Sequence, residues 1–157
     1  MKFVISKDLE HSKLLNTLMM GVSLSLLFYL VFDVILHGFI VGSDIPTISN
    51  TLYGNVDEFI EPILLDTLLL QVHIDLFMSL LTLMILSTMY IRLFSEEKKT
   101  KWLIHLLFIL GLVTPLMLLV AYMSSLFFVY MWILMLLAGH LLAIFFAVRI
   151  VKKLFSL

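Results

Sequence analysis

Residues 106–139, LLFILGLVTPLMLLVAYMSSLFFVYMWILMLLAG, contain no charged residue, and this stretch decides the class of protein. An α-helix needs about 20 predominantly apolar residues to cross the hydrocarbon core of a bilayer. The stretch holds most of two such helices, with the short turn YMSS at residues 122–125 between them. We therefore expect a hairpin of transmembrane helices at about 102–122 and 126–148.

The composition of the whole chain supports the same class. Of its 157 residues, 62% are hydrophobic and only 13% are charged, and the mean hydropathy is +1.16. Soluble domains are about half apolar and a quarter charged, so this composition predicts an integral membrane protein whose main partner is the lipid bilayer. The net charge of -1 gives no support for a nucleic-acid partner. With no cysteine, the chain has no disulfides and no cysteine-ligated metal centre.

Two further apolar stretches, at about 14–40 and 63–94, bring the predicted transmembrane helices to four. An acidic loop at 41–62 separates these two, and we expect a short surface helix at its end. The ten Lys and Arg residues all fall on the opposite side from this loop. They are Lys2, Lys7, Lys13, Arg92, Lys98, Lys99, Lys101, Arg149, Lys152 and Lys153.

This charge distribution predicts an orientation. By the positive-inside rule both termini are cytoplasmic, and the inner membrane of a bacterium is the natural setting. Short loops between consecutive helices favour an up-down-up-down antiparallel bundle. We expect one domain, an all-α four-helix bundle over residues 1–157. His11 precedes the first helix and is expected at the surface.

Polar residues interrupt the first two predicted helices. Along 14–40 they follow one helical face, on which Asp33 and His37 are four residues apart and close enough to interact. Along 63–94, His73 and Asp75 are separated by about 200° of helical rotation and point in nearly opposite directions. His73 therefore shares a face with Asp66, and Asp75 belongs to a second polar stripe. We expect that stripe to be structural, and it comprises Thr67, Gln71, Asp75 and Ser79.

Each predicted helix carries one histidine, and this pattern is compatible with b-type haem. Two histidines on facing helices can hold a haem iron axially. His37 with His73 forms an outer pair, and His105 with His140 an inner pair, which together predict electron transfer across the membrane. One histidine on each of four helices is similar in arrangement to membrane cytochromes b, although no sequence motif names a family. This is the leading interpretation from the sequence.

Two alternatives stay open. Asp33, His37, Asp66 and His73 are candidate ligands of a transition-metal ion or members of a proton relay, because imidazole and carboxylate suit such ions. Alternatively, the protein binds no cofactor and is an accessory or assembly subunit, with other membrane subunits or a second copy of itself as partners. No phosphate-binding loop, zinc-protease helix or nucleophile elbow is present. A stand-alone enzyme is therefore the less favoured expectation.

The third and fourth predicted helices contain two further features. Pro115 is expected to kink the third helix, with the Thr114 hydroxyl near the interrupted backbone. In the fourth, Gly139 precedes His140 and allows a close neighbour.

Overall fold

The computed structural model describes residues 13–156, so the predictions for Lys2, Lys7 and His11 lie outside the described residues. Four helices are long and apolar enough to cross a membrane, as the sequence predicts. Residues 13–156 form no strand, and Asn55 and Ile60 make one isolated bridge. The helices are α2 (Lys13–Ile40), α3 (Ile45–Tyr53), α4 (Leu65–Phe94), α5 (Thr100–Met123) and α6 (Leu126–Phe155).

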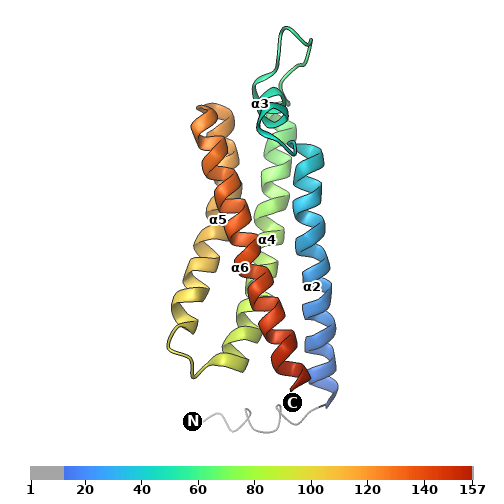
Figure 1. Ribbon diagram of the computed structural model, residues 1–157, viewed down its shortest axis with the longest axis vertical. Helices are drawn as coiled ribbons and strands as arrows, with labels where there is room; N and C mark the ends of the chain where they lie inside the picture. Colours follow the sequence, from blue (N-terminus) through green and yellow to red (C-terminus); the bar gives the residue numbers. More distant parts are fainter. Residues whose placement is uncertain (1–12, 157) are drawn as a thin grey trace.

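The four long helices lie side by side, and α3 sits at one end of them (Figure 1). The connection 41–64 and the turn 124–125 lie at this end, and the loop 95–99 lies at the other. Helix α5 packs against both α4 and α6, whereas α2 packs mainly along α6 and contacts α4 much less. Helix α6 extends to Phe155, beyond the predicted span end at 148, because its last two turns carry basic residues that favour a helix C-terminus.

Helix α2 ends at a glycine. Gly42 has a φ of 133°, a conformation that side chains disfavour, and its N–H donates to the carbonyl of His37. Helix α3 then begins at once, because the Asp44 side chain accepts from the N–H of Thr47 and Pro46 occupies the first turn. The prediction of a short helix at the end of the 41–62 loop is therefore wrong. The helix lies in the first half of this loop.

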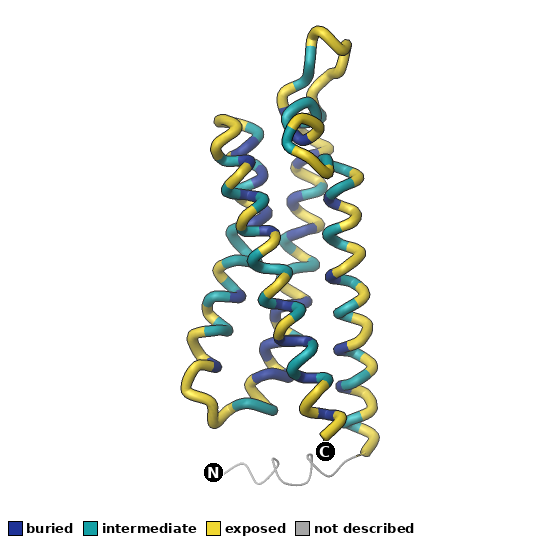
Figure 2. Tube along the Cα trace, in the orientation of Figure 1, coloured by how far each residue is buried: buried dark blue, intermediate teal, exposed yellow. Residues whose placement is uncertain are grey.

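The apolar residues that the helices bury form two clusters, one toward each end. The cluster at the 95–99 end contains Tyr90, Leu107 and Phe146, with the rings of Tyr90 and Phe146 stacked at 4.0 Å between centroids. The cluster at the α3 end contains Leu118 and Trp132. Most leucines and phenylalanines outside these clusters are exposed and cover the outer surface (Figure 2). In a bilayer this surface contacts lipid.

The two ends of the bundle are held by different polar contacts. At the α3 end, the hydroxyl of Tyr53 donates to the carbonyl of Ala121 over 2.7 Å. At the opposite end, Arg149 forms a bidentate pair with Glu97, with Nη2 2.7 Å from Oε1, and stacks over the ring of Phe94. The Arg149 guanidinium holds the pKa of Glu97 below its usual range. This ion pair holds the 95–99 loop against α6.

Replacing Phe146 by Ala tests the cluster at the 95–99 end. Because Phe146 is fully buried, the variant leaves a cavity and loses its stacking on Tyr90. We expect a loss of on the order of 2 kcal/mol of stability, below the range for water-soluble cores because the unfolded side chain still faces lipid. Thermal unfolding in detergent measures it, and Phe32→Ala, at a site 66% exposed, is the matched control. Equal losses in both variants would contradict the packing described.

Candidate functional site: a buried histidine and carboxylate cluster

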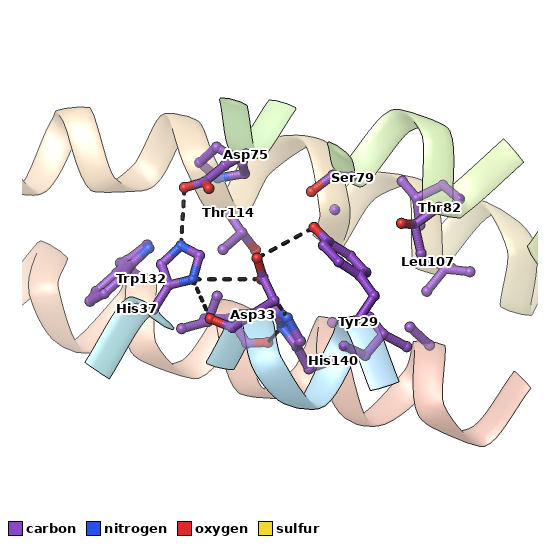
Figure 3. Close-up of a pocket in the computed structure, with 17 residues that line it drawn as sticks. Tyr29, Asp33, His37, Asp75, Ser79, Thr82, Leu107, Thr114, Trp132 and His140 are labelled. Atoms are coloured by element: carbon purple, nitrogen blue, oxygen red, sulfur yellow. Dashed lines mark hydrogen bonds and ion pairs between the residues drawn. The ribbon is translucent and has the colours of Figure 1, made fainter. Parts of the chain in front are cut away.

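Between the two apolar clusters, polar side chains from three helices meet. Asp33 and His37 come from α2, Asp75 from α4 and His140 from α6 (Figure 3). In each of these helices the polar residues occur between the segments that supply the two clusters. His37 is 4% exposed and Asp75 8% exposed, so neither faces the outer surface. We refer to these four residues as the His/Asp cluster.

Each carboxylate oxygen in the His/Asp cluster has a partner. Asp75 lies with Oδ2 3.0 Å from Nε2 of His37, and its Oδ1 accepts from the Gln71 amide over 2.8 Å. Asp33 lies with Oδ2 2.9 Å from Nε2 of His140, and its Oδ1 accepts from the Tyr29 hydroxyl over 3.3 Å. Because a carboxylate in hydrocarbon costs several kcal/mol without partners, this arrangement makes the two acidic groups tolerable inside the bundle.

Both imidazole rings of the His/Asp cluster are oriented by a contact between Nδ1 and a backbone carbonyl. Nδ1 of His37 is 2.9 Å from the backbone carbonyl of Asp33, and Nδ1 of His140 is 2.8 Å from that of Leu136. A carbonyl oxygen only accepts, so Nδ1 carries a proton in both rings. In a neutral imidazole Nε2 is then an acceptor, yet in both rings it faces a carboxylate oxygen. Each of these two contacts requires either a proton or a cation.

The His/Asp cluster has the composition of a metal site. One ligand atom each from Asp33, His37 and Asp75 lies within 4.8 Å of the others, which makes them a possible ion-binding group. His140 contacts Asp33, but its ligand atom is not within this distance of all three, so it joins the group only through Asp33. Histidines that bind metals commonly donate their other ring N–H to a backbone carbonyl or a carboxylate, which orients the ring. Both histidines here show that arrangement.

A small cavity lies beside these residues, between all four long helices. Its volume is about 50 Å³, and all four residues of the His/Asp cluster line it. At roughly 10–15 Å³ per water, it holds an ion or a few water molecules. Helix α5 closes the opposite wall with small or apolar groups, including Gly111, Thr114 and Pro115. The Thr114 hydroxyl donates to the carbonyl of Leu110, and α5 stays helical through Pro115.

Some predicted site residues do not join the His/Asp cluster. The side chains of His73, Asp66 and His105 are exposed, and none of them lines the cavity. The partner of His37 is Asp75, from the stripe expected to be structural, and not His73. The face of α4 that carries Asp66 and His73 is therefore exposed among residues 13–156. On the Asp75 face of α4, Gln71 and Ser79 are half-buried, whereas Thr67 of the same stripe is exposed.

The geometry gives the haem interpretation no support. The histidine pairs proposed for two haems are not brought together, because His73 and His105 are exposed, whereas His37 and His140 contact carboxylates of the His/Asp cluster. The cavity is also far below the roughly 300 Å³ of an ordinary cofactor pocket. The same donors and the same small volume suit a single ion.

The sequence analysis did not identify two residues of the site, Tyr29 and Trp132. Tyr29 precedes Asp33 by four residues, the same spacing that joins Gln71 to Asp75, so its contact was accessible to sequence reasoning. Trp132 precedes His140 by eight residues, on the same helical face, and lies beside the His37 ring with centroids 6.2 Å apart (Figure 3). No polar pattern marks this tryptophan, because its spacing is also that of a core residue.

The chain matches no protein-family model, and neither the comparison with curated proteins nor the comparison with solved structures finds a match. The site is therefore interpreted from its own chemistry.

A double-mutant cycle tests the contact between α2 and α4. The variants His37→Ala, Asp75→Ala and the pair should show a coupling energy of about 1–3 kcal/mol, since each single change leaves a buried partner unpaired. Thermal or denaturant unfolding in detergent provides the measurement. The control cycle uses His73→Ala with Asp75→Ala, where His73 is exposed on another face, and its coupling should be near zero. Comparable couplings in the two cycles would disprove the assigned pairing.

Proposed function

We propose that this protein is an integral membrane metal-binding protein that holds one divalent first-row transition ion, such as Zn²⁺ or Fe²⁺, at Asp33, His37 and Asp75, with His140 moving in as the fourth ligand. The observation that carries the proposal is the pair of contacts between an imidazole Nε2 and a carboxylate oxygen, each with Nδ1 bound to a backbone carbonyl. Two imidazoles and two carboxylates are a donor set that these ions favour.

Charge balance supports a divalent ion. The two carboxylates carry two negative charges into a low-dielectric interior, where an unbalanced charge is costly. A divalent cation neutralises both of them and occupies the acceptor face of both rings. Two protons, one at each Nε2–carboxylate contact, achieve the same balance. The site therefore has two neutral states, and binding an ion replaces two protons.

The proposal includes the orientation and the oligomeric arrangement of the bundle in the membrane. The basic residues among 13–156 lie at or near the end that holds the 95–99 loop, whereas Asp44, Asp57, Glu58 and Glu61 lie at the α3 end. The positive-inside rule places the basic end in the cytoplasm of a bacterial cell. Four helices form a binding site, and a complete transport pathway would need further copies or other subunits.

Metal titration tests the function. Purified protein should bind one Co²⁺ per chain, with a ligand-field absorption spectrum and one ion per chain by elemental analysis. Asp33→Asn and His37→Ala should each lower affinity by about 100-fold or more, because loss of a direct ligand exceeds the 10–100-fold effect of losing an outer partner. His73→Ala is the matched control and should bind as the native chain does. Absence of binding in the native protein, or its loss in His73→Ala, would overturn the proposal.

The two-proton exchange has its own signature. Because both ligand contacts must lose a proton, we expect release of two protons per ion and an affinity that falls about 100-fold per pH unit on the acid side. A pH indicator in weakly buffered detergent solution measures the release. Zn²⁺ added to the His37→Ala variant controls for protons released from surface groups. Zero protons released by the native protein would contradict the charge balance above.

Labelling of single cysteines tests the orientation, since the chain has no cysteine of its own. Val56→Cys, at a position 91% exposed in the 41–62 loop, should react with a membrane-impermeant thiol reagent on intact cells. Lys98→Cys, in the 95–99 loop at the other end, should react only after the membrane is permeabilised. The reverse pattern would place the basic end outside.

A further inference from the structure

A second and larger hollow lies next to the His/Asp cluster, between α2, α3 and α6. Its volume is about 640 Å³, and it opens at the surface. Ser43 and Asp44, which join α2 to α3, line it at the α3 end. His37 lines it deeper along α2, so one residue of the cluster is in its wall. We call this hollow the α2–α6 groove.

The groove and the small cavity share a wall. His37, Trp132 and Leu136 line both of them, and no other residue in the described range 13–156 does so. These three side chains therefore separate the open groove from the buried His/Asp cluster. A movement of one ring in this wall is the shortest change that would connect the two spaces.

Trp132 has an unsatisfied polar atom at this wall. Its side chain is 2% exposed, and its indole Nε1 has no hydrogen-bond partner among residues 13–156. Tryptophan is only a donor, so the N–H needs an oxygen acceptor. Buried polar groups nearly always have a partner, often ordered water. Less than 1 Å² of Nε1 is accessible in this conformation, so the donor meets water only when the Trp132 ring moves within the shared wall.

The mouth of the groove favours cations. The Asp44 carboxylate accepts from the N–H and the hydroxyl of Thr47, which hold the pKa of Asp44 below its usual range. Asp44 is therefore ionised at neutral pH, outside the helices that span the membrane. A negative charge at a concave entrance raises the local concentration of cations. Gly38, on the α2 wall, adds no side chain to narrow the passage.

We infer that the α2–α6 groove is a hydrated vestibule through which divalent cations enter the His/Asp cluster from the α3 end, with the Trp132 ring moving in the shared wall so that its N–H meets the water that accompanies the ion. The inference rests on the proposed function, and it adds the route and the side of entry. The occupant of the groove is water carrying a hydrated cation, and a lipid chain in the groove is the alternative that the experiment tests.

Thiol accessibility in lipid nanodiscs, where both ends of the protein are open to solution, tests hydration of the groove. Gly38→Cys has room for its side chain, since the nearest atom to an added Cβ is 4.0 Å away. It should react with a small cationic methanethiosulfonate about tenfold or more faster than Leu36→Cys, because only a hydrated thiol forms thiolate. Leu36 is the matched control, being 49% exposed on α2 and lining neither hollow.

Stopped-flow Co²⁺ binding tests the route itself. Gly38→Phe fills the groove, and Co²⁺ association should slow by about tenfold, because entry then requires a conformational change, with equilibrium affinity unchanged. Trp132→Phe keeps the ring but removes the N–H, and it should also slow association. Trp102→Phe, at a site 65% exposed, should not.

The outcomes separate the two proposals. Equal thiol reactivity at positions 38 and 36 indicates lipid in the groove and overturns the route, even where Co²⁺ binds at equilibrium. Unchanged association in Gly38→Phe overturns it as well. A reactive Gly38→Cys together with no Co²⁺ binding in the native chain overturns the proposed function, and the ion route fails with it.

Discussion

The structure depends on the cost of placing two carboxylates inside a bundle that lipid surrounds. Asp33 and Asp75 satisfy this constraint with four donors, one for each oxygen, from Tyr29, His140, Gln71 and His37. Three of the four long helices must therefore come together at one depth. The polar contacts cannot slide by a turn without leaving an oxygen unpaired in a low-dielectric interior, so they also determine the register of the helices.

The apolar clusters explain why the polar layer lies where it does. Without a hydrophobic driving force between helices in lipid, the bundle relies on packing and on polar contacts. Large rings fill the two ends, with Tyr90 and Phe146 stacked in one cluster and Trp132 in the other. The His/Asp cluster lies between them and is thereby kept from both surfaces. The α2–α6 groove adjoins it, with the Trp132 ring in the wall that separates the two.

Much of the fold follows from the sequence, because span length and charge depend on local composition alone. The four apolar stretches and the acidic loop were predicted to within a few residues at most ends. The start of α3 was missed, although Asp44 and Pro46 are ordinary signals for a helix N-terminus. The longer α6 was missed because a helix continues into water through Arg149 and Lys152, whereas hydropathy marks only the apolar part.

The contacts of the site within one helix were predictable from the sequence, whereas the contacts between helices were not. Spacing along one helix identifies Asp33 with His37, and Asp75 with Gln71, since these pairs depend on helical period alone. Which face of α4 meets α2 depends on how the helices are rotated in the bundle. The sequence does not determine this rotation, and it predicts His73 as a site residue and Asp75 as part of a structural stripe. His73 was preferred because histidines suggested a cofactor. The buried face of α4 is instead the one that carries Asp75, which contacts His37.

The weak packing of α2 against α4 makes the pairing of His37 with Asp75 more than a structural contact. Helix α5 supplies none of the four donors, but it packs firmly on α4 and α6 and forms a fixed wall. Gly111 of α5 allows this close approach, because an added Cβ would lie 2.6 Å from a methyl carbon of Leu83. Helix α2 packs along α6, and its few contacts with α4 include the bridge between His37 and Asp75. A change from two protons to one ion at that bridge therefore acts where the bundle is least constrained, and the spacing of α2 from α4 is the structural variable that it would alter.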